Sequence, residues 1–403
     1  MNQNAERRLV ERGAWNDVSE PFGRLRLAYL TNISSPYRID MIEAWARLNP
    51  QLFISVYYTD AGDQGRGWTT RPMSGVAECK LPILADIPSY GKINRNLVDL
   101  VRQNDVIMIG GFEQASYLYA ALLARLLGKP VILLFDGFSP ARFEVEPSAV
   151  RVLKRITASL CNSFFANGRV GRIYLENHIR VAPGKPIYNQ FLSHSDKHIA
   201  EARTHVIGME KTAIRARLGI ETERMVLMCC GYLIQRKRID LIISAISHLP
   251  VSSRPLLLVV GMGPLADTLA LQAKTSGVPI HFAGFKQQLE LAIHYFAADA
   301  LVLASEDDPW GLVVNEAMSA GLPVIVSDAC GAALDLVHEG VNGFVFQNRN
   351  NVALSKAIER LFDSDLPAMG AASKKMIKDW TAEHSALNLG RCVNDAILLK
   401  SSR

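Results

Sequence analysis

The stretch Ser305–Asp328, SEDDPWGLVVNEAMSAGLPVIVSD, carries the acidic side chains best placed to bind a polar substrate. Asp308 follows a strand-like apolar run, and Glu316 lies in the first turns of a helix that comes after a Pro-Trp-Gly turn. Both carboxylates can therefore face one cleft at the carboxyl end of a sheet and accept hydrogen bonds from vicinal sugar hydroxyls. The structural alternative is that Glu316 only complements the helix dipole and that Asp308 caps the turn.

The start of that helix is a second candidate binding element. Backbone N–H groups in the first turn of a helix have no partner within the helix, and the helix dipole favours an anion there. The residues that would offer these groups are Gly311, Leu312 and Val313.

Three consecutive cations, Arg236, Lys237 and Arg238, lie in the segment GYLIQRKRID between a strand and a helix. Cations at a helix N-terminus oppose the helix dipole, so their presence there indicates that a ligand requires them. Together they would form a phosphate site, in which Arg binds in a bidentate manner and Lys acts as a point charge. A solvated basic loop is an equally good interpretation of a charge triplet alone.

Two further strand ends offer weaker signals. Gly261 and Gly263 open a helix after an apolar strand, and glycine there allows backbone to approach a ligand. This Gly-x-Gly is not the dinucleotide fingerprint, because no third glycine follows. In the first half, Asp136 ends the strand-like run PVILLFD and would face the same cleft, although for this residue taken alone a turn-forming Asp-Gly is the favoured explanation.

Short apolar strands alternate with helices in both halves of the chain, which predicts two parallel sheets with helices on both faces. In the first half we expect strands at Arg24–Asn32, Gln51–Thr59, Asp105–Gly110, Pro130–Asp136 and Ile187–Asn189, and helices at Tyr37–Leu48 and Gln114–Leu127. In the second half we expect strands at Met225–Gly231, Leu256–Gly261, Ile280–Ala283, Ala300–Ala304, Pro323–Ser327 and Gly343–Phe346, and helices at Ile239–Leu249, Leu265–Ser276, Leu289–Ala298 and Val313–Ala320.

The predicted fold class is therefore α/β, with two Rossmann-like domains facing a central cleft. The N-terminal domain is expected to span residues 22–200 and the C-terminal domain residues 201–380. After Asn350 the sequence predicts helices up to the end of the chain. The last helix, within residues 381–403, is expected to return to the first domain.

Composition limits the class of protein. The chain has 403 residues, with 44 Lys and Arg against 39 Asp and Glu, which gives a formal net charge of +5. This balance is too weak to indicate nucleic-acid binding by itself. The six cysteines show no metal-ligand spacing, so we expect neither a disulfide framework nor a metal site, and a reducing cytoplasm is the expected location. No secretory signal or membrane span is expected.

The segments together resemble glycosyltransferase family 4, retaining enzymes with the two-domain GT-B fold. GYLIQRKRIDLIISAI, VVGMGPLADTL, HFAGF, ALVLASEDDPWGLVVNEAMSAGLPVIVSD and GVNGFVF occur in the order and spacing of that family, and the opening LTNISSPYRIDMIEAWARLN is similar to members with a Ser-Pro-Tyr-Arg element. The resemblance covers about residues 24–360.

This resemblance implies a nucleotide-sugar donor held by the C-terminal domain and an acceptor held by the N-terminal domain. Glu316 matches the glutamate that binds the donor ribose, Asp308 stands at the position of the glutamate that contacts the donor sugar, and Lys237 matches the lysine that contacts the diphosphate. The base would lie against Gly284 and Phe285.

The chain also departs from the family pattern. The active-site histidine of the family is replaced by Asp136. Tyr232 stands where arginine is common, so Arg236 is expected to supply the second phosphate contact.

The resulting hypothesis is a metal-independent retaining glycosyltransferase of surface polysaccharide or glycolipid biosynthesis, with no cofactor apart from the nucleotide-sugar substrate. A catalytically degenerate GT-B protein that binds nucleotide sugar or a partner is the main alternative, and phosphorolysis or epimerisation on the same fold is another. Its partners would be the donor and a glycan or lipid-linked acceptor, with no nucleic acid; the oligomeric state stays open. Peripheral contact with the inner face of the plasma membrane is a further expectation, through Arg7, Arg8, Arg12, Arg24 and Arg26, although scattered arginines are usually only solvated.

Overall fold

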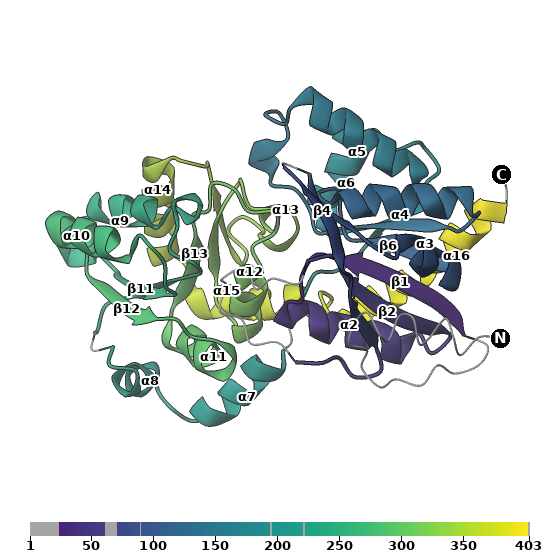
Figure 1. Ribbon diagram of the computed structural model, residues 1–403. Coiled ribbons are helices and arrows are strands. Elements are labelled where there is room, and N and C mark those ends of the chain that lie inside the picture. The colour runs from purple at the N-terminus through teal and green to yellow at the C-terminus, as the bar shows by residue number, and fades with distance from the viewer. Residues whose placement is uncertain (1–23, 61–70, 89, 194–195, 221, 402–403) are drawn as a thin grey trace. The chain divides into compact units, whose positions relative to one another are not determined.

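The structure is a computed structural model that describes residues 24–60, 71–88, 90–193, 196–220 and 222–401 (Figure 1). The chain forms two compact units. The first comprises the described residues of Met1–Gly137, Glu146–Ser193 and Thr381–Arg403, and the second those of Phe138–Val145 and His194–Trp380. Of the arginines named for membrane contact, Arg7, Arg8 and Arg12 lie outside the described residues.

The first unit is built on a seven-stranded parallel sheet with the order β3-β2-β1-β6-β7-β8-β9. Its strands are β1 (Leu25–Thr31), β2 (Leu52–Tyr58), β3 (Ala77–Lys80), β6 (Val106–Ile109), β7 (Val131–Phe135), β8 (Ser163–Ala166) and β9 (Ile187–Asn189). All residues of β2, β6, β7 and β8 are buried, as is typical of a sheet covered on both faces. The order of the strands reverses between β1 and β6.

Helices and one hairpin surround this sheet. They are α2 (Pro36–Leu48), α3 (Leu97–Gln103), α4 (Ala115–Leu126), α5 (Ser148–Leu160), α6 (Gly168–Ile173), the π-helix η2 (Tyr174–Ile179), α16 (Ala382–Ser401) and the hairpin β4 (Ile83–Ile87) and β5 (Gly91–Asn94). The C-terminal helix α16 packs against α2, where Trp45 Nε1 donates a 2.9 Å hydrogen bond to Ser385 Oγ. The predicted return of the last helix to the first domain is confirmed.

The second unit contains a six-stranded parallel sheet with the order β12-β11-β10-β13-β14-β15, which is the Rossmann order 3-2-1-4-5-6. Its strands are β10 (Val226–Cys230), β11 (Leu256–Val260), β12 (Ile280–Gly284), β13 (Ala300–Leu303), β14 (Val324–Ser327) and β15 (Gly343–Phe346). The strand order reverses between β10 and β13, and such a reversal opens a crevice at the carboxyl ends of the strands.

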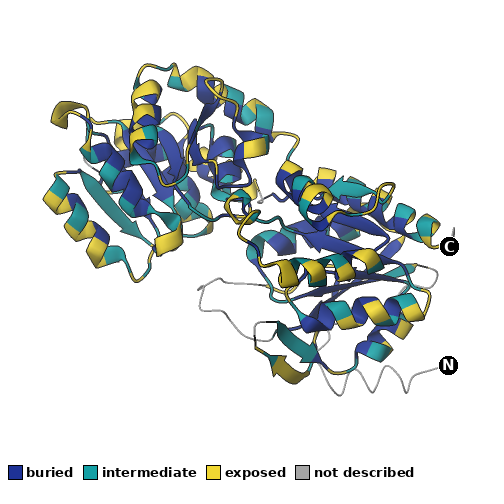
Figure 2. Cartoon of the chain, turned by 90° about the horizontal axis from the view of Figure 1, so that it is seen from above, coloured by how far each residue is buried: buried dark blue, intermediate teal, exposed yellow. Residues whose placement is uncertain are grey.

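The helices of the second unit are α7 (Lys197–Val206), α8 (Lys211–Arg217), α9 (Ile239–Ser247), α10 (Ala266–Ser276), α11 (Gln288–Ala297), α12 (Val313–Ala320), α13 (Ala333–Leu336), α14 (Asn351–Phe362) and α15 (Leu366–Ile377). Short 3₁₀ turns η1 (Pro140–Arg142), η3 (Gln235–Lys237) and η4 (Val251–Ser253) complete it. Figure 2 shows the central strands of both sheets buried, whereas the edge strand β12 is intermediate and the hairpin strand β4 is largely exposed.

The expected α/β architecture of two Rossmann-like domains is confirmed by these two sheets. All six cysteines are free thiols, as expected. Within the described part of the chain, no helix is both long enough and apolar enough to cross a bilayer.

Candidate active site

The reversal point of the second sheet brings together residues from two loops that are distant in sequence. Lys237 lies in η3 after β10, and Asp308 lies after β13. Lys237 Nζ donates a 2.6 Å hydrogen bond to Asp308 Oδ2, and the two form a salt bridge. The sequence predicted separate roles for these two residues, and the structure adds a direct pairing between them at the carboxyl edge of this sheet.

Asp308 is only 7% exposed, so its charge depends on its neighbours. Burial by itself raises the pKa of Asp308, but the ammonium of Lys237 and the positive charge of Arg236 more than offset this and hold the pKa below its ordinary value. The carboxylate thus stays ionised at neutral pH. Arg236 lies on the surface, and its guanidinium donates to the carbonyl oxygen of Asp307.

Arg238, the third cation of the triplet, was expected to face a phosphate ligand, but in the structure it pairs with carboxylates. Arg238 donates to Asp240 and to Glu306, two carboxylates of its own unit. Because Arg238 begins α9 with a φ of 50°, its side chain turns back to the first turn of that helix, where Asp240 complements the helix dipole. Only Arg236 and Lys237 of the triplet lie near Asp308.

Glu316, in the first turn of α12, is held by a residue that the sequence did not single out. The hydroxyl of Tyr295, from α11, donates a 2.6 Å hydrogen bond to Glu316 Oε2. Tyr295 is completely buried, and burial together with the charge of Glu316 raises the pKa of its hydroxyl far above the ordinary value. The tyrosine therefore acts as a fixed donor that orients one carboxylate oxygen of Glu316.

The thiol of Cys230, at the end of β10, lies beside this pair. Burial and the nearby charge of Glu316 raise its pKa strongly, so the thiol stays protonated and unreactive at neutral pH.

The segment before α12 is closely packed. Trp310 is buried, stacks on Trp380 with ring centroids 5.1 Å apart, and donates from Nε1 to Asn315 Oδ1. Gly311 has a φ of 88°, and a Cβ there would lie 2.6 Å from Cys330 Sγ. The sequence predicts that Gly311, Leu312 and Val313 hold an anion; the structure places them where the loop after β13 enters α12.

The backbone at Gly261 and Gly263 packs directly against the backbone of a neighbouring loop, with no room for a side chain. A Cβ on Gly261 would lie 1.9 Å from the carbonyl oxygen of Gly231, and one on Gly263 would lie 2.5 Å from that of Leu233. These glycines let the loops after β10 and β11 pass each other closely, which fixes the loop that carries Lys237. The contact of Gly261 and Gly263 with a ligand stays a prediction. The close approach of the two loops is a separate structural reason why glycine occupies both positions.

We expect Gly261→Ala to destabilise the chain by about 2–4 kcal/mol, because it adds both a clash and a strained φ. The φ of Gly261 is 152°, which side chains rarely adopt. Gly219→Ala is the matched control, because Gly219 has a φ of 71° with open space around its Cβ position. Denaturant unfolding of both variants separates the clash from the strain, and equal losses of stability would contradict the explanation.

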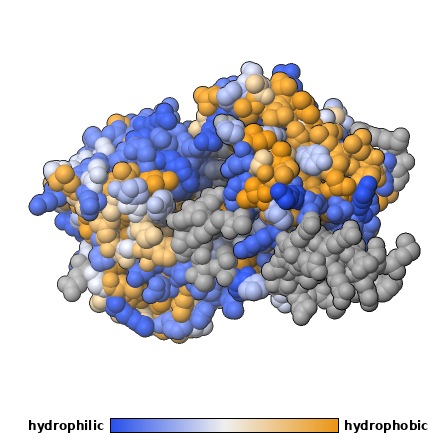
Figure 3. Space-filling model, in the orientation of Figure 1, coloured by the Kyte–Doolittle hydropathy of each residue, from blue (hydrophilic) through white to orange (hydrophobic). Residues whose placement is uncertain are grey.

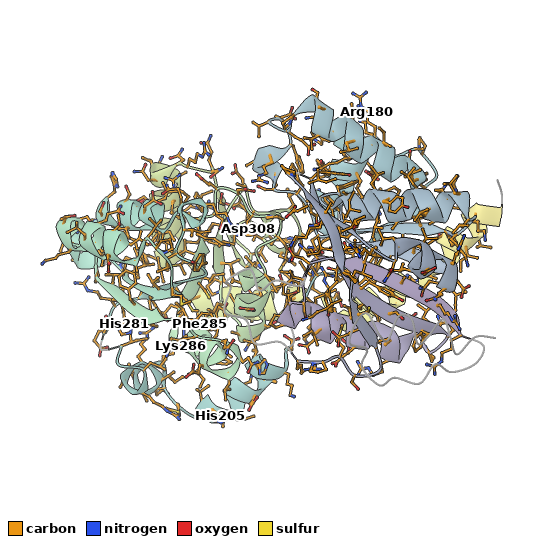
Figure 4. The ribbon with its side chains drawn as sticks, in the orientation of Figure 1. Arg180, His205, His281, Phe285, Lys286 and Asp308 are labelled. Atoms are coloured by element: carbon orange, nitrogen blue, oxygen red, sulfur yellow. The ribbon has the colours of Figure 1, made fainter. Side chains whose placement is uncertain are left out.

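Gly284 and Phe285 lie at the carboxyl end of β12, an edge strand of the second sheet. Gly284 has a φ of 72°, and nothing lies within 4 Å of its Cβ position. Phe285 is 40% exposed, and Figure 4 shows it next to Lys286 at this strand end, with Asp308 farther along the same unit. An open glycine beside an exposed aromatic ring suits the predicted contact with a flat base.

Asp136, at the end of β7 in the first unit, is part of a second cluster. Its Oδ1 accepts hydrogen bonds from Arg38, in the first turn of α2, and from Gln190 Nε2, after β9, the latter at 3.0 Å. Arg38 also donates to Gln190 Oε1 at 3.1 Å. The Arg38 side chain is 6% exposed, whereas that of Asp136 is 44% exposed. One oxygen of the Asp136 carboxylate is thus held by protein donors, while the side chain stays accessible to solvent. Its contacts go beyond those of a residue that only forms an Asp-Gly turn.

A shallow recess lies beside this cluster. Its polar lining comes from Thr31, Ser34, Ser35 and Tyr58, and Arg38 forms one wall. Thr31 and Tyr58 are the last residues of β1 and β2, and Ser34 and Ser35 follow β1, so the recess occupies the carboxyl edge of the first sheet. The predicted loop NISSPYR therefore contributes both the recess and the arginine that holds Asp136.

The family that matches this chain covers only a region within the second unit. Residues 210–379 match the family described as glycosyl transferases group 1, which confirms the resemblance for this region. The chain is 34% identical over 239 residues to the sulfoquinovosyl transferase SQD2 of Arabidopsis thaliana, covering 56% of the chain and 44% of that protein. It is 33% identical over 178 residues to a GDP-mannose-dependent alpha-(1-6)-phosphatidylinositol monomannoside mannosyltransferase of Mycobacterium tuberculosis, covering 40% of the chain and 44% of the relative. The chain thus spans less than half the length of these curated relatives.

Solved structures match the whole architecture. A sucrose-phosphate synthase from Thermosynechococcus elongatus aligns with a TM-score of 0.69 at 17% identity, covering 93% of this chain and 100% of that one. HepE of Anabaena, solved in complex with UDP, aligns with a TM-score of 0.67 at 14% identity, covering 92% and 99%. At these identities the likeness concerns the fold alone, and it confirms the predicted GT-B fold class.

Proposed function

Residues 210–379 match the glycosyl transferases group 1, and on this premise we propose that the chain is a retaining glycosyltransferase. It moves a sugar from a nucleotide-diphosphate donor to a hydroxyl acceptor, in the synthesis of a surface polysaccharide or glycolipid in the cytoplasm. The observation that carries the proposal is the pairing of Lys237 with Asp308 at the reversal point of a Rossmann-order sheet, with Glu316 in the first turn of the helix that follows. A crevice at this point is the general ligand site of such sheets.

The donor is proposed to lie along the carboxyl edge of the second sheet. The base contacts Gly284 and Phe285, and the ribose hydroxyls donate to Glu316, whose Oε2 is already oriented by Tyr295. The diphosphate lies between the start of α12 and the side chains of Arg236 and Lys237. The HepE structures in complex with UDP and with UDP-glucose support a nucleotide-sugar donor.

Transfer proceeds in this proposal with retention of the anomeric configuration. The acceptor oxygen bonds to the anomeric carbon on the face from which the diphosphate leaves, and the bond from that carbon to the diphosphate oxygen breaks. The acceptor hydroxyl gives its proton to the departing phosphate, so no protein base is needed. Arg236 and Lys237 stabilise the negative charge that develops on the phosphate, which is the largest expected catalytic contribution.

The acceptor is proposed to bind at the carboxyl edge of the first sheet. Arg38 and Gln190 hold Oδ1 of Asp136, and the exposed side of this carboxylate accepts a hydrogen bond from an acceptor hydroxyl.

We expect Asp136→Asn to lower kcat/KM for the acceptor about 10- to 100-fold, the range that follows from losing one hydrogen bond to a charged group. The affinity for the donor is expected to stay unchanged, because Asp136 lies in the other unit. Steady-state kinetics with varied acceptor, together with calorimetric titration of the donor, checks both. Asp86→Asn, at an exposed position of β4, is the control. A loss of donor affinity without a change in acceptor dependence would contradict this assignment.

A second candidate function is a degenerate GT-B protein that binds nucleotide sugar without transfer. The replacement of the family's usual histidine by Asp136 favours it, whereas the intact set of Lys237, Asp308 and Glu316 favours an enzyme. Incubation of the full chain with a nucleotide sugar and with lipid or glycan extracts distinguishes the two. An enzyme releases nucleoside diphosphate in proportion to glycosylated product, and a binding protein releases none although it binds the donor.

A further inference from the structure

A short segment from the first half of the chain, Phe138–Val145, belongs to the second unit. We call it the 138–145 segment. It contains the 3₁₀ turn η1, in which the backbone N–H of Arg142 donates a 2.9 Å hydrogen bond to the carbonyl oxygen of Ser139. Ser139 is completely buried, and its Oγ donates a 2.8 Å hydrogen bond to the carbonyl oxygen of Ala329, which follows β14. Ser139 therefore anchors the turn that carries Arg142.

The anchor of the 138–145 segment also supports the candidate active site. The backbone N–H of Asp308 donates to the same carbonyl oxygen of Ala329 at 3.4 Å, and Asp308 forms a parallel β-bridge with Cys330. One carbonyl group thus joins Ser139 to the backbone of the buried Asp308. The 138–145 segment therefore lies next to the loop after β13 within the second unit.

The side chain of Arg142 is held at a carboxylate of that loop. Its Nε lies 2.8 Å from Asp307 Oδ2 in a salt bridge, and its Cζ lies 5.8 Å from the centroid of the Phe138 ring. Phe138 in turn stacks on Phe143, with ring centroids 6.4 Å apart. The Arg142 side chain is still 56% exposed. Because the salt bridge is made through Nε, the two Nη groups of this guanidinium can donate in parallel to an oxyanion.

Two arginines therefore approach the same residue of this loop. Arg236 donates from Nη1 to the carbonyl oxygen of Asp307 at 3.0 Å, and Arg142 pairs with the carboxylate of Asp307. Lys237 pairs with the next residue, Asp308. Three positive charges thus meet two carboxylates, which leaves a surplus of one positive charge that favours an anionic ligand.

The neighbouring carboxylate of Glu306 does not cancel this surplus. Glu306 Oε2 accepts hydrogen bonds from Arg238 and Arg349, each at 3.1 Å, and Asp240 is the second partner of Arg238. These two arginines and two carboxylates balance one another. Figure 3 shows a largely hydrophilic surface over α9 and α14, the helices that begin after Arg238 and Arg349, at the upper left of the view. The surroundings of the cluster are therefore polar.

We propose that Arg142 is the third cation of the diphosphate site. Its guanidinium, held by Asp307 through Nε, donates hydrogen bonds to the non-bridging oxygens of the diphosphate, both in the bound donor and in the nucleoside diphosphate that leaves. Arg142 thus takes the role that the sequence assigned to Arg238. The assignment rests on the proposed function, and it adds a residue from outside the region 210–379 that matches the family.

The test titrates the full chain calorimetrically with UDP and GDP, and with uridine and guanosine as ligands that lack the phosphates. We expect the parent to bind one nucleoside diphosphate more tightly than the corresponding nucleoside. Arg142→Gln should bind that diphosphate about 10- to 100-fold more weakly, which is the range for losing hydrogen bonds to a charged group, and should bind the nucleoside like the parent. Arg142→Lys keeps the charge without the planar fork and should recover part of the affinity.

Asp307→Asn separates a phosphate contact from a purely structural salt bridge. It removes the partner of Arg142 and one negative charge beside the site, so it should bind the diphosphate at least as tightly as the parent. Arg360→Gln is the matched control, because Arg360 is 54% exposed, pairs with Glu339 and lies over the ring of Phe344 in the same unit. It should bind both ligands like the parent. Circular dichroism checks that each variant is folded.

Three results would overturn the proposal. In the first, Arg142→Gln binds the diphosphate like the parent, or loses affinity for the nucleoside as much as for the diphosphate. In the second, Arg142→Gln and Asp307→Asn lose diphosphate affinity equally, which would make their salt bridge a structural link only. In the third, the parent binds neither UDP nor GDP, so the proposed donor site fails together with this assignment. Only the third result contradicts the proposed function.

Discussion

Lys237→Ala is expected to lower the turnover number about 10²–10³-fold, which is the effect of removing one group that stabilises developing charge in a transition state. It is also expected to destabilise the chain by about 3–5 kcal/mol, because it leaves a buried carboxylate without its partner. The partner is Asp308, which is 7% exposed and receives a 2.6 Å hydrogen bond from Lys237. Nucleoside diphosphate release and denaturant unfolding measure the two effects.

A double variant separates these two contributions. Lys237→Ala/Asp308→Asn removes the unpaired charge, so it should recover most of the lost stability while its turnover stays low. Recovery of turnover in the double variant, or normal stability in Lys237→Ala, would contradict the assigned pair. Lys356→Ala, on the surface of α14, serves as the control for loss of a positive charge.

The acid range gives an independent check of the same pair. The pKa of Asp308 is lowered from 3.8 in the folded chain, so its pairing stabilises the fold above that value. This stabilisation is lost as the pH falls below 3.8 and through the lowered pKa. The stability difference between the parent and Lys237→Ala should therefore be largest near neutral pH and shrink in acid.

Glu316→Ala is expected to weaken donor binding about 100-fold, because hydrogen bonds from ribose hydroxyls to a carboxylate are each worth about 1.5–3 kcal/mol. The variant also leaves the buried hydroxyl of Tyr295 without its acceptor. Calorimetric titration with a nucleotide sugar measures the loss. Tyr295→Phe keeps the carboxylate but not its orientation, so a smaller loss is expected.

Glu339→Gln is the control for this experiment, since Glu339 is an exposed partner of Arg360 in the same unit. It should bind the donor like the parent. Equal donor affinity of the parent and Glu316→Ala would contradict the assignment of Glu316 to the ribose.

The order of strands and helices in the second unit could be predicted closely because its strands are continuous apolar runs. The runs around Val226–Cys230 and Leu256–Val260 contain almost no polar residue, and glycine follows each of them. In the first unit the short strand Ser163–Ala166 and helix Ser148–Leu160 were missed. The strand has only four residues and gives a short apolar run. The helix has the spacing of an amphipathic helix, so its sequence pattern was sufficient to predict it.

The pairings within the site could not be predicted in the same way. The approach of Lys237 to Asp308 follows from the strand order, since adjacent β10 and β13 place their following loops together. Tyr295 gives no such signal, because a buried tyrosine in α11 has the same sequence pattern as any core aromatic residue. The pairing of Arg238 with Asp240 and Glu306 depends on a left-handed backbone at Arg238, which the sequence does not indicate.

The cluster around Asp136 illustrates the same limit. Arg38, Asp136 and Gln190 come from three separate segments, and only the sheet order brings their loops together. The sequence indicated Asp136 through its place at a strand end, but nothing in it indicated that a buried arginine and an amide would hold one of its oxygens.

The central claim is that the carboxyl edge of the second sheet binds a nucleotide-diphosphate sugar. Thermal and chemical unfolding of the full chain with a panel of UDP- and GDP-sugars tests it most directly. We expect one of them to stabilise the parent by about 2.7 kcal/mol at a ligand concentration 100 times Kd, and to give Glu316→Ala far less stabilisation at the same concentration. Stabilisation by no nucleotide sugar, or equal stabilisation of the parent and Glu316→Ala, would contradict the claim.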